Sequence, residues 1–497
     1  MGVCDLRIGE KERKKMGIRE ELEKVFHPQT VAVVGAPRRR PEGWPGIFGS
    51  IRDYGFPGRL YPINPGVPEV EGIRTYPDLV SVPEPIDLVI ISVPAPAVPA
   101  ALRDCIASGN RNVHIFTAGF KETGEEEGLR LHREIEAIAR DGGLNVIGPN
   151  CMGVFNPEER FVTWTGAPEK SGHVAFISQS GGHAQDFTNF CARLGIGFSK
   201  VISFGNALTL DSTDFLEYLA EDSDTRIITM YLEGIRDGRR LLDLVSRINA
   251  TKPVIILKAG LTDAGTKAVA SHTGSLAGGQ RVWDAFFKRS GAVRAHSLED
   301  MAFLTLAFCH LQTAAGLRVA VISHGGGIAV SAADACSNAG LEIPSFSSLT
   351  EQTLRTFIPP GGNIIKNPVD AMPLFRDLKV FKQMIDLIAS EPQIDMLIVS
   401  LSLDWLYGVD EGRQIREVTD YLAGPVARQL HGKPLVVSWR TYRNDPAIRD
   451  VGCRLEKKIL QAGVPVYRGF EQASETLALW ARYHMVLHAR GLKRFLP

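Results

Sequence analysis

Cysteine is scarce in this sequence and has no regular spacing. The seven cysteines are odd in number and scattered over 497 residues, and no CxxC pair occurs. This excludes a disulfide framework or a paired-cysteine zinc site as the organising feature, and it is typical of a reduced compartment. No apolar stretch suited to a secretory signal follows the basic residues 11–15, and no apolar run approaches the about 18 residues of a membrane span. We therefore expect a cytoplasmic protein.

An excess of charge of either sign is also lacking. Lys and Arg number 56, Asp and Glu number 56, and the net charge is zero. No global field favours nucleic acid or an anionic membrane, so an anionic ligand would have to be held locally. The length suggests roughly three domains, and the 49 glycines are typical of an α/β protein with many tight strand-to-helix turns.

The first unit, residues 20–155, is predicted to be a doubly wound parallel sheet. A continuous β-branched run, Thr30 to Val34, ends at Gly35, as expected for a buried parallel strand that enters a turn. Helical patterns separate this run from later apolar ones, which favours alternating strands and helices. The further strands are predicted at residues 59–65, 87–93, 112–120 and 144–151.

The turn after the first strand lacks the GxGxxG fingerprint of dinucleotide-binding folds. Three arginines, residues 38–40, stand there instead, and the second strand ends at Asn64, where a ribose-binding carboxylate would be needed. NAD is therefore disfavoured, whereas guanidinium groups at a strand end suit phosphates. Pro94 follows the third strand and is placed to begin a helix whose free N–H groups face the same crevice.

The second unit, residues 170–312, repeats the strand, turn and helix pattern. A strand at 174–177 leads into Ser180, Gly181 and Gly182 and then a helix, a combination in which backbone N–H groups and hydroxyls can surround a phosphate-sized anion. Further strands are predicted at 199–205, 226–234 and 253–260.

His272 is the candidate centre of the chemistry. It lies among small residues in the segment 258–279, in a loop that we expect to follow the strand at 253–260 and to expose the imidazole. An imidazole can act as a base, a metal ligand or a nucleophile at neutral pH. A metal is the weakest of these hypotheses, because no second ligand stands at a suitable spacing on the segment. Glu233 ends a neighbouring strand at the same edge of the sheet and could accept a hydrogen bond from the imidazole.

A third α/β unit is predicted at residues 317–490. It begins with a strand, the glycine-rich turn that follows His324, and a helix. We interpret His324 as a turn residue. Asn367 to Asp370 lie in a connection rich in glycine and proline.

The motifs of the three units resemble those of one family. The first unit contains VAVVGA, YPINP, SVPAPAVP, TAGF and GPNCMG; the second contains SQSGG, SFGN, YLEGI and SHTGSLAGG; the third contains SHGGG and NPVD. In this order they resemble the α subunit of NDP-forming acyl-CoA synthetases, which include ADP-forming acetyl-CoA synthetase and belong to the succinyl-CoA synthetase superfamily. The likeness extends over residues 20–480, and YLEGI and SHTGSLAG are its most specific parts.

The resemblance implies an α/β fold of three successive parallel-sheet units, a Rossmann-like CoA-binding domain followed by two flavodoxin-like ligase domains. It also implies that His272 carries a phosphoryl group, that Glu233 orients and stabilises the phosphohistidine, and that the Ser180, Gly181 and Gly182 turn caps it at a helix N-terminus. Coenzyme A would be a substrate bound to the first domain. The residues implied to line its loops are Gly35, Arg38, Asn64, Pro65, Val93, Pro94, Ala118, Gly119, Asn150 and Cys151.

Two features depart from the family pattern. The first loop, PRRRPEGWPG, is longer and more basic than the family's small-residue turn. Neither an ATP-grasp module nor a Walker A motif is recognisable, although the family needs ATP or ADP with Mg. We therefore expect a separate ATP-grasp β subunit in an α2β2-type hetero-oligomer, and that subunit could add a second helix N-terminus for the phosphohistidine.

The sequence leaves three hypotheses. The first is an enzyme subunit that joins CoA to a small carboxylic acid, with acetate-like and larger acids, including aryl acids, all open. The second is a CoA- or acyl-CoA-binding regulatory protein without turnover, which would have no use for His272, Glu233 and the SQSGG turn together. The third, an NAD-dependent dehydrogenase, is disfavoured by the missing glycine fingerprint and by Asn64.

Overall fold

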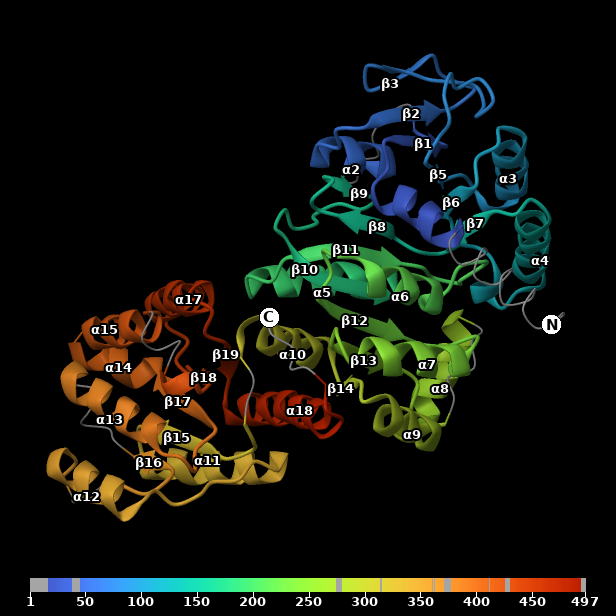
Figure 1. The fold of residues 1–497 in the computed structure, drawn as a ribbon. Coiled ribbons are helices and arrows are strands. Elements are labelled where there is room, and N and C mark those ends of the chain that lie inside the picture. The colour runs from blue at the N-terminus through green and yellow to red at the C-terminus, as the bar shows by residue number, and fades with distance from the viewer. Residues whose placement is uncertain are drawn as a thin grey trace. The chain divides into compact units, whose positions relative to one another are not determined.

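Contacts divide the chain into two compact units, Met1–Leu298 and Glu299–Pro497 (Figure 1). The three domain boundaries predicted from the sequence stay predictions. The structure, a computed structural model, describes residues 17–37, 45–273, 279–312, 315–359, 361, 363–370, 377–410, 412–424 and 430–492, without the side chains of 270–273 and 408–410. In the described part, no helix has both the length and the apolar composition needed to cross a bilayer.

The first sheet of the N-terminal unit is parallel and has the strand order β2-β1-β5-β6-β7. A short antiparallel pair, β3 and β4, forms a separate two-stranded sheet. The strands are β1 (Thr30–Val34), β2 (Arg59–Ile63), β3 (Glu69–Val70), β4 (Ile73–Arg74), β5 (Leu88–Ile91), β6 (Asn112–Ile115) and β7 (Asn145–Ile147). The helices are a segment at residues 17–26, α2 (Gly46–Tyr54), η1 (Ala95–Ala97), α3 (Val98–Ala107), η2 (Lys121–Thr123) and α4 (Glu126–Asp141).

The second sheet has the order β14-β13-β12-β10-β11-β8-β9. Its first five strands in this order are parallel, and β8 and β9 extend it as antiparallel strands. The strands are β8 (Gly153–Asn156), β9 (Phe161–Val162), β10 (Ser171–Ser178), β11 (Phe198–Ser203), β12 (Ile227–Leu232), β13 (Val254–Lys258) and β14 (Val293–Ala295). The helices are α5 (Gly181–Arg193), α6 (Ser212–Glu221), α7 (Gly238–Ile248), α8 (Asp263–Thr273) and α9 (Gln280–Ser290).

The C-terminal unit contains a third parallel sheet, of order β16-β15-β17-β18-β19. Its strands are β15 (Val319–Ser323), β16 (Val369–Asp370), β17 (Met396–Ser402), β18 (Leu435–Arg440) and β19 (Val466–Arg468). The helices are α10 (Leu298–His310), α11 (Gly326–Ala339), α12 (Ser348–Phe357), α13 (Leu378–Ser390), α14 (Leu403–Asp410), α15 (Arg413–Leu422), η4 (Leu430–Gly432), α17 (Pro446–Gln461) and α18 (Phe470–Ala489).

All three sheets reverse their winding direction at the same place. In each, the first parallel strand lies between the second and the third, so β1, β10 and β15 each flank a switch point. In doubly wound sheets, ligands bind in the crevice at the carboxyl ends of the strands that flank this point. The predicted three parallel-sheet units are therefore confirmed, and their topology indicates where sites should form.

The two sheets of the N-terminal unit share an apolar core. Val31 and Val33 of β1 face a cluster that also contains Phe48 of α2 and Ile177 of β10, whereas Ala32 faces a second cluster on the opposite side. This alternation explains the continuous β-branched run, because both faces of the strand are buried. The first sheet therefore packs against helices on both sides.

Candidate functional site

The turn predicted to cap a phosphohistidine and the glutamate predicted to orient it flank the switch point of the second sheet. Strands β10 and β12 are adjacent, with Ser178 opposite Tyr231. The Ser180 turn follows the first strand and Glu233 follows the second, so both lie at the same carboxyl edge. The fold therefore brings together two of the predicted site elements.

The Ser180 turn forms the start of helix α5. Ser180 is extended, and its hydroxyl accepts a hydrogen bond from the His183 backbone N–H at 3.3 Å. The buried Ser178 hydroxyl donates to the Ser180 carbonyl at 2.6 Å. Gly182 has open space where a Cβ would lie, whereas a Cβ on Gly181 would come within 2.5 Å of Met152 Cγ. The N-terminus of α5 is thus rigid and accessible at Gly182, as an anion site requires.

Glu233 is fixed by its neighbours and is only 4 % exposed. The side-chain carbonyl of Gln179 accepts the backbone N–H of Glu233 at 2.8 Å and that of Gly234 at 2.9 Å. The Tyr231 hydroxyl donates to Glu233 Oε1 at 3.2 Å. Gln179 belongs to the SQSGG turn, so one amide side chain ties the two turns together. This role was not predicted from the sequence, although the position of Gln179 beside Ser180 could have suggested it.

Lys258 also contacts Glu233. Its ammonium group donates to the Glu233 carbonyl at 2.9 Å and to the Ala259 carbonyl, and it lies 5.2 Å from the centre of the Trp283 ring. Burial lowers the pKa of Lys258 to about 8, and the nearby Glu233 carboxylate opposes that shift. Lys258 is therefore a buried positive charge that fixes the ends of β12 and β13, a role that was not predicted from the sequence.

This lowered pKa predicts a pH-dependent stability. Between pH 8 and the ordinary value of 10.5, the unfolded chain binds the Lys258 proton more tightly than the folded chain does. Raising the pH through this window should stabilise the wild type relative to Lys258→Met, because the cost of burying an ammonium group is fully present only below it. Urea unfolding at about pH 7 and about pH 9.5 measures the difference. Lys267→Met, at an exposed position of α8, is the control and should show no such change.

His272 falls in helix α8, not in the exposed loop that we predicted. The helix covers Asp263–Thr273, so the backbone of His272 belongs to its last turn. The His272 side chain lies outside the described residues. Helix α8 follows β13, which is adjacent to β12, and it also contacts η2 of the first sheet. The loop prediction was wrong because the alanines and the lysine before His272 favour a helix more than its small neighbours favour a turn.

The turns predicted to line CoA meet at the carboxyl edge of the first sheet. Gly35 has a φ of +89°, and a Cβ there would lie 2.6 Å from the Ser92 carbonyl oxygen and 2.7 Å from Val93 Cγ1, so only glycine fits. The Asn64 amide donates to the Ala36 carbonyl at 2.9 Å, which places Asn64 and Pro65 beside the first turn. Pro94, which follows β5 at the same edge of the sheet, is exposed.

The remaining predicted turns continue along this edge. The Thr117 hydroxyl donates to the Val93 carbonyl at 2.6 Å, and the Asn150 N–H donates to the Thr117 carbonyl at 3.0 Å. Ala118 is exposed, and Gly119 adjoins Ala95.

Two of the predicted lining residues differ from the rest. Arg38 lies outside the described residues. Cys151 is buried, its thiol is directed toward the Ile115 carbonyl at 3.8 Å, and burial raises the thiol pKa. The Cys151 side chain therefore packs in the core and does not face the crevice.

The SFGN turn after β11 packs tightly on the GPNC turn of the first sheet. The Asn206 N–H donates to the Pro149 carbonyl at 3.0 Å, and Gly205 has a φ of +52°. Gly205→Ala would place a Cβ 2.2 Å from the Asn150 carbonyl oxygen. We expect a loss of about 2–4 kcal/mol in the free energy of unfolding, because the obstacle is backbone. Chemical denaturation tests this, with Gly238→Ala at the start of α7, where the added Cβ meets nothing within 4 Å, as the control; equal losses would contradict it.

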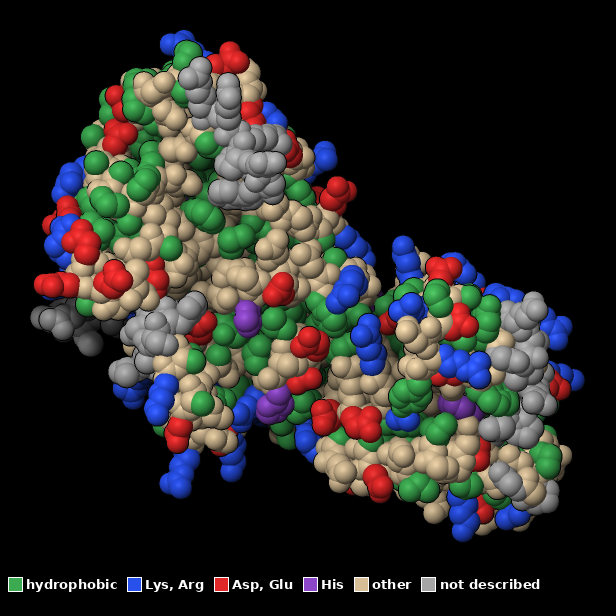
Figure 2. All heavy atoms as spheres, turned by 180° about the vertical axis from the view of Figure 1, so that it is seen from behind, with side chains coloured by type: hydrophobic (Ala, Val, Ile, Leu, Met, Phe, Trp, Pro, Cys, Tyr) green, Lys and Arg blue, Asp and Glu red, His purple; other side chains and the backbone are tan. Residues whose placement is uncertain are grey.

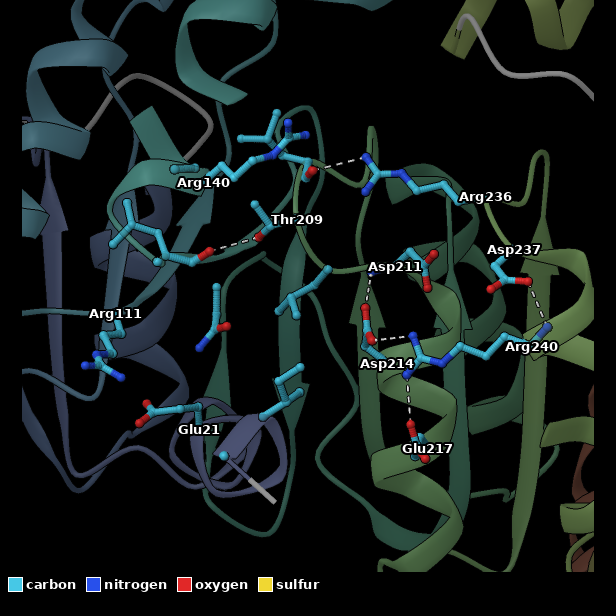
Figure 3. A pocket seen from close by; sticks show the side chains of 18 of the residues that line it. Glu21, Arg111, Arg140, Thr209, Asp211, Asp214, Glu217, Arg236, Asp237 and Arg240 are labelled. Carbon is cyan, nitrogen blue, oxygen red and sulfur yellow. Dashed lines mark hydrogen bonds and ion pairs between the residues drawn. The ribbon is translucent and has the colours of Figure 1, made fainter. Parts of the chain in front are cut away.

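A charged groove of about 1370 Å³ has a lining that contains none of the residues just named in these turns (Figure 3). Arg111 and Asn145, at the amino ends of β6 and β7, belong to its lining, so it opens at the opposite edge of the first sheet. Within it, Arg240 pairs with Asp214 and Glu217, both at 2.8 Å. No site residue predicted from the sequence is among its described lining residues. Over the face drawn in Figure 2, acidic and basic side chains are interspersed, as they are in the groove.

Comparisons with known proteins connect the domains that carry these turns with one family. Residues 29–157 match the family model of a CoA binding domain, and residues 171–308 match that of a succinyl-CoA ligase like flavodoxin domain. The α subunit of ADP-forming acetate–CoA ligase II from Pyrococcus furiosus is 38% identical over 471 residues, which cover 95% of this chain and 98% of that subunit. The chain belongs to the family of ADP-forming acyl-CoA synthetase α subunits.

Other members of this ligase family show the same relationship. ADP-forming acetate–CoA ligase I from Archaeoglobus fulgidus is 36% identical over 382 residues, which cover 77% of this chain but 55% of that protein. The chain thus spans about half the length of this longer ligase. The solved structure of dinucleotide forming acetyl-coenzyme A synthetase 1 from Ca. Korarchaeum cryptofilum, in complex with phosphate and ADP, matches with a TM-score of 0.78 and 30% identity, over 95% of this chain and 99% of that one.

Proposed function

We propose that this α subunit interconverts acyl-CoA, ADP and phosphate with a carboxylic acid, CoA and ATP, through an acyl phosphate and a phosphohistidine at His272. The observation that carries the proposal is that the Ser180 turn and Glu233 lie together at the switch point of the second sheet. The same compact unit contains the turns predicted to line CoA, which we name the CoA-suited turns. A separate ATP-grasp β subunit would supply the nucleotide site. ADP-forming relatives named α subunits support such a division.

The proposed reaction has three balanced steps. Phosphate attacks the acyl carbon of acyl-CoA, the thioester bond breaks, and CoA and an acyl phosphate form. His272 then takes the phosphoryl group from the acyl phosphate and releases the carboxylate. Finally the phosphoryl group passes to ADP on the partner and forms ATP. Positioning and charge stabilisation are most of what such transfers require of a protein.

The residues of the second crevice suit the phosphohistidine step. A phosphoryl group brings about two negative charges, which the exposed helix start at Gly182 and the Ser180 turn can stabilise. Glu233, held between Gln179, Tyr231 and Lys258, would accept a hydrogen bond from the phosphorylated imidazole and fix its orientation. The CoA-suited turns would deliver the thiol from the first sheet.

The partner's share of the chemistry is limited to the nucleotide. ATP or ADP, with Mg, would bind to the ATP-grasp module and exchange the phosphoryl group with His272. The proposal also carries the α2β2-type assembly and a cytoplasmic location forward from the sequence. A CoA-binding regulator without turnover stays the second candidate, because the CoA-suited turns alone would serve either role.

Reconstitution tests the proposal. The purified chain, alone and with a candidate ATP-grasp protein, is incubated with CoA, ATP and acids from acetate to aryl acids, and thioester and ADP are quantified by chromatography. We expect equal amounts of thioester and ADP only when both proteins are present. CoA binding without product from any acid or partner would favour the regulator, and AMP as the product would contradict the proposal.

A further inference from the structure

Glu122 links the two sheets of the N-terminal unit at their adjoining carboxyl edges. Its Oε1 accepts the backbone N–H of Gly119 at 2.7 Å and that of Phe120 at 3.1 Å. Its Oε2 accepts the side-chain amide of Asn206, which lies in the SFGN turn after β11. One carboxylate therefore holds a turn of the first sheet and a turn of the second.

The Asn206 turn is held from two further directions. The Lys121 ammonium donates to the Asn206 carbonyl at 3.0 Å, and the Asn206 N–H donates to the Pro149 carbonyl at 3.0 Å. Asn206 itself is 3 % exposed. We name Lys121, Glu122 and Asn206 the latch. It leaves little freedom for the turns that follow β6, β7 and β11 to move separately.

The latch also adjoins the helix that contains His272. Helix α8 contacts η2, and η2 contains Lys121 and Glu122. The same short segment thus touches the turn predicted to line CoA, the SFGN turn and α8. These are the parts that must be aligned if a thiol on the first sheet is to meet an acyl phosphate beside His272.

The chemistry of Glu122 favours a fixed, ionised carboxylate. Burial acts to raise its pKa, but the backbone N–H groups and the Asn206 amide outweigh burial, and the pKa is lowered. Hydrogen bonds to an ionised acceptor are stronger than neutral ones. Only a carboxylate offers acceptor oxygens to both sides at once, because a glutamine would present an NH₂ group to one of them.

We propose that Glu122 is a positioning residue for the acyl transfer between CoA and the acyl phosphate; this rests on the proposed function. In that step the CoA sulfur forms the thioester bond, the bond from the acyl carbon to phosphate breaks, and phosphate leaves with the electron pair and takes up the thiol proton. Phosphoryl exchange between ATP and His272 does not involve CoA. The latch therefore affects the first of these reactions and not the second.

The test compares the two half-reactions in the assembled complex. We expect Glu122→Gln to lower kcat/KM for CoA, with acyl phosphate as co-substrate, by about 10–100-fold, as for a misplaced reacting group. Labelling of His272 by ATP should stay within about twofold of the wild type, since that exchange needs no thiol. Glu126→Gln, at the exposed first residue of α4, is the matched control and should change neither.

A compensating pair separates positioning from a general loss of structure. Asn206→Asp should also impair thioester formation, because it places a second carboxylate against Glu122. In the double variant Glu122→Gln with Asn206→Asp, the glutamine oxygen can still accept both backbone N–H groups while its NH₂ group donates to the aspartate. We expect kcat/KM for CoA to be at least about tenfold higher in the double variant than in Glu122→Gln, since the double variant restores the hydrogen bonds.

Three results would overturn the latch: unchanged kcat/KM in Glu122→Gln, an equal loss in both half-reactions, or no recovery in the double variant. If a single variant does not fold, kcat/KM for CoA in the double variant is compared with that of the wild type. A value near the wild type supports the latch, and a value reduced by about 10-fold or more overturns it. Should the wild-type complex make neither thioester nor phosphohistidine, the proposed function fails, and calorimetric titration with CoA still tests the latch. In that titration, CoA binding that is weaker in Glu122→Gln and restored in the double variant supports the latch. Equal CoA binding in the wild type and Glu122→Gln overturns the latch.

Discussion

His272→Ala is expected to abolish acid-dependent turnover of the reconstituted complex, with a fall of at least about 10⁴-fold in kcat, since removal of a covalent catalyst leaves little of the reaction. The acid-labile, base-stable label that ATP or acetyl phosphate leaves on the α subunit should disappear with it. CoA binding should stay unchanged, because the CoA-suited turns belong to the other sheet. Radiolabel retention and calorimetry measure the two effects.

The control for this variant is His488→Ala. His488 is exposed in the last turn of α18 and belongs to the C-terminal unit, so its substitution removes an imidazole that is not among the predicted site residues. Labelling and turnover should equal those of the wild type. If His272→Ala still accepted the label at the wild-type rate, the covalent route through His272 would be excluded.

Glu233→Gln is expected to have the second largest effect. Glutamine keeps the size of the side chain and can still accept from Tyr231, so the turn should keep its shape. It removes the negative charge that would stabilise the protonated ring of a phosphorylated imidazole. Losses of one such electrostatic contact lower kcat by about 10²–10³-fold, and we expect that range.

The lifetime of the phosphoenzyme distinguishes this role from a folding defect. In Glu233→Gln the labelled protein should form more slowly and decay to phosphate faster than in the wild type. Glu169→Gln removes an exposed carboxylate just before β10, at the opposite edge of the sheet, and should leave both rates unchanged. Wild-type rates of formation and decay in Glu233→Gln would remove Glu233 from the mechanism.

The strands and their turns could be predicted because short local stretches of sequence determine them. The run from Thr30 to Val34 followed by Gly35 can form little else than a buried parallel strand and a tight turn, and the strands at Ile227–Leu232 and Val254–Lys258 have the same character. The carboxyl ends of parallel strands meet at one edge of a sheet, so the Ser180 turn and Glu233 could be placed together from the sequence pattern alone.

The contacts that complete the site could not be predicted in this way. Gln179, Lys258 and Glu122 act through partners far away in the sequence, and hydrogen bonds of that kind depend on how the sheets pack. Cys151 follows a predicted turn residue but points into the core, because the direction of one side chain depends on the local backbone. Helix α8 was missed because glycine and serine near His272 outweighed the stretch Lys267 to Ala270, which favours a helix.

The most direct test of the central claim is to locate the phosphoryl group in the working enzyme. The complex is quenched under alkaline conditions during turnover, and the α subunit is digested and sequenced by mass spectrometry with electron-transfer fragmentation, which preserves phosphohistidine. We expect one phosphoryl group on the peptide that contains His272, formed from ATP and removed on addition of the acid and CoA. A phosphoryl group on another residue, or turnover without any phosphorylated α subunit, would contradict it.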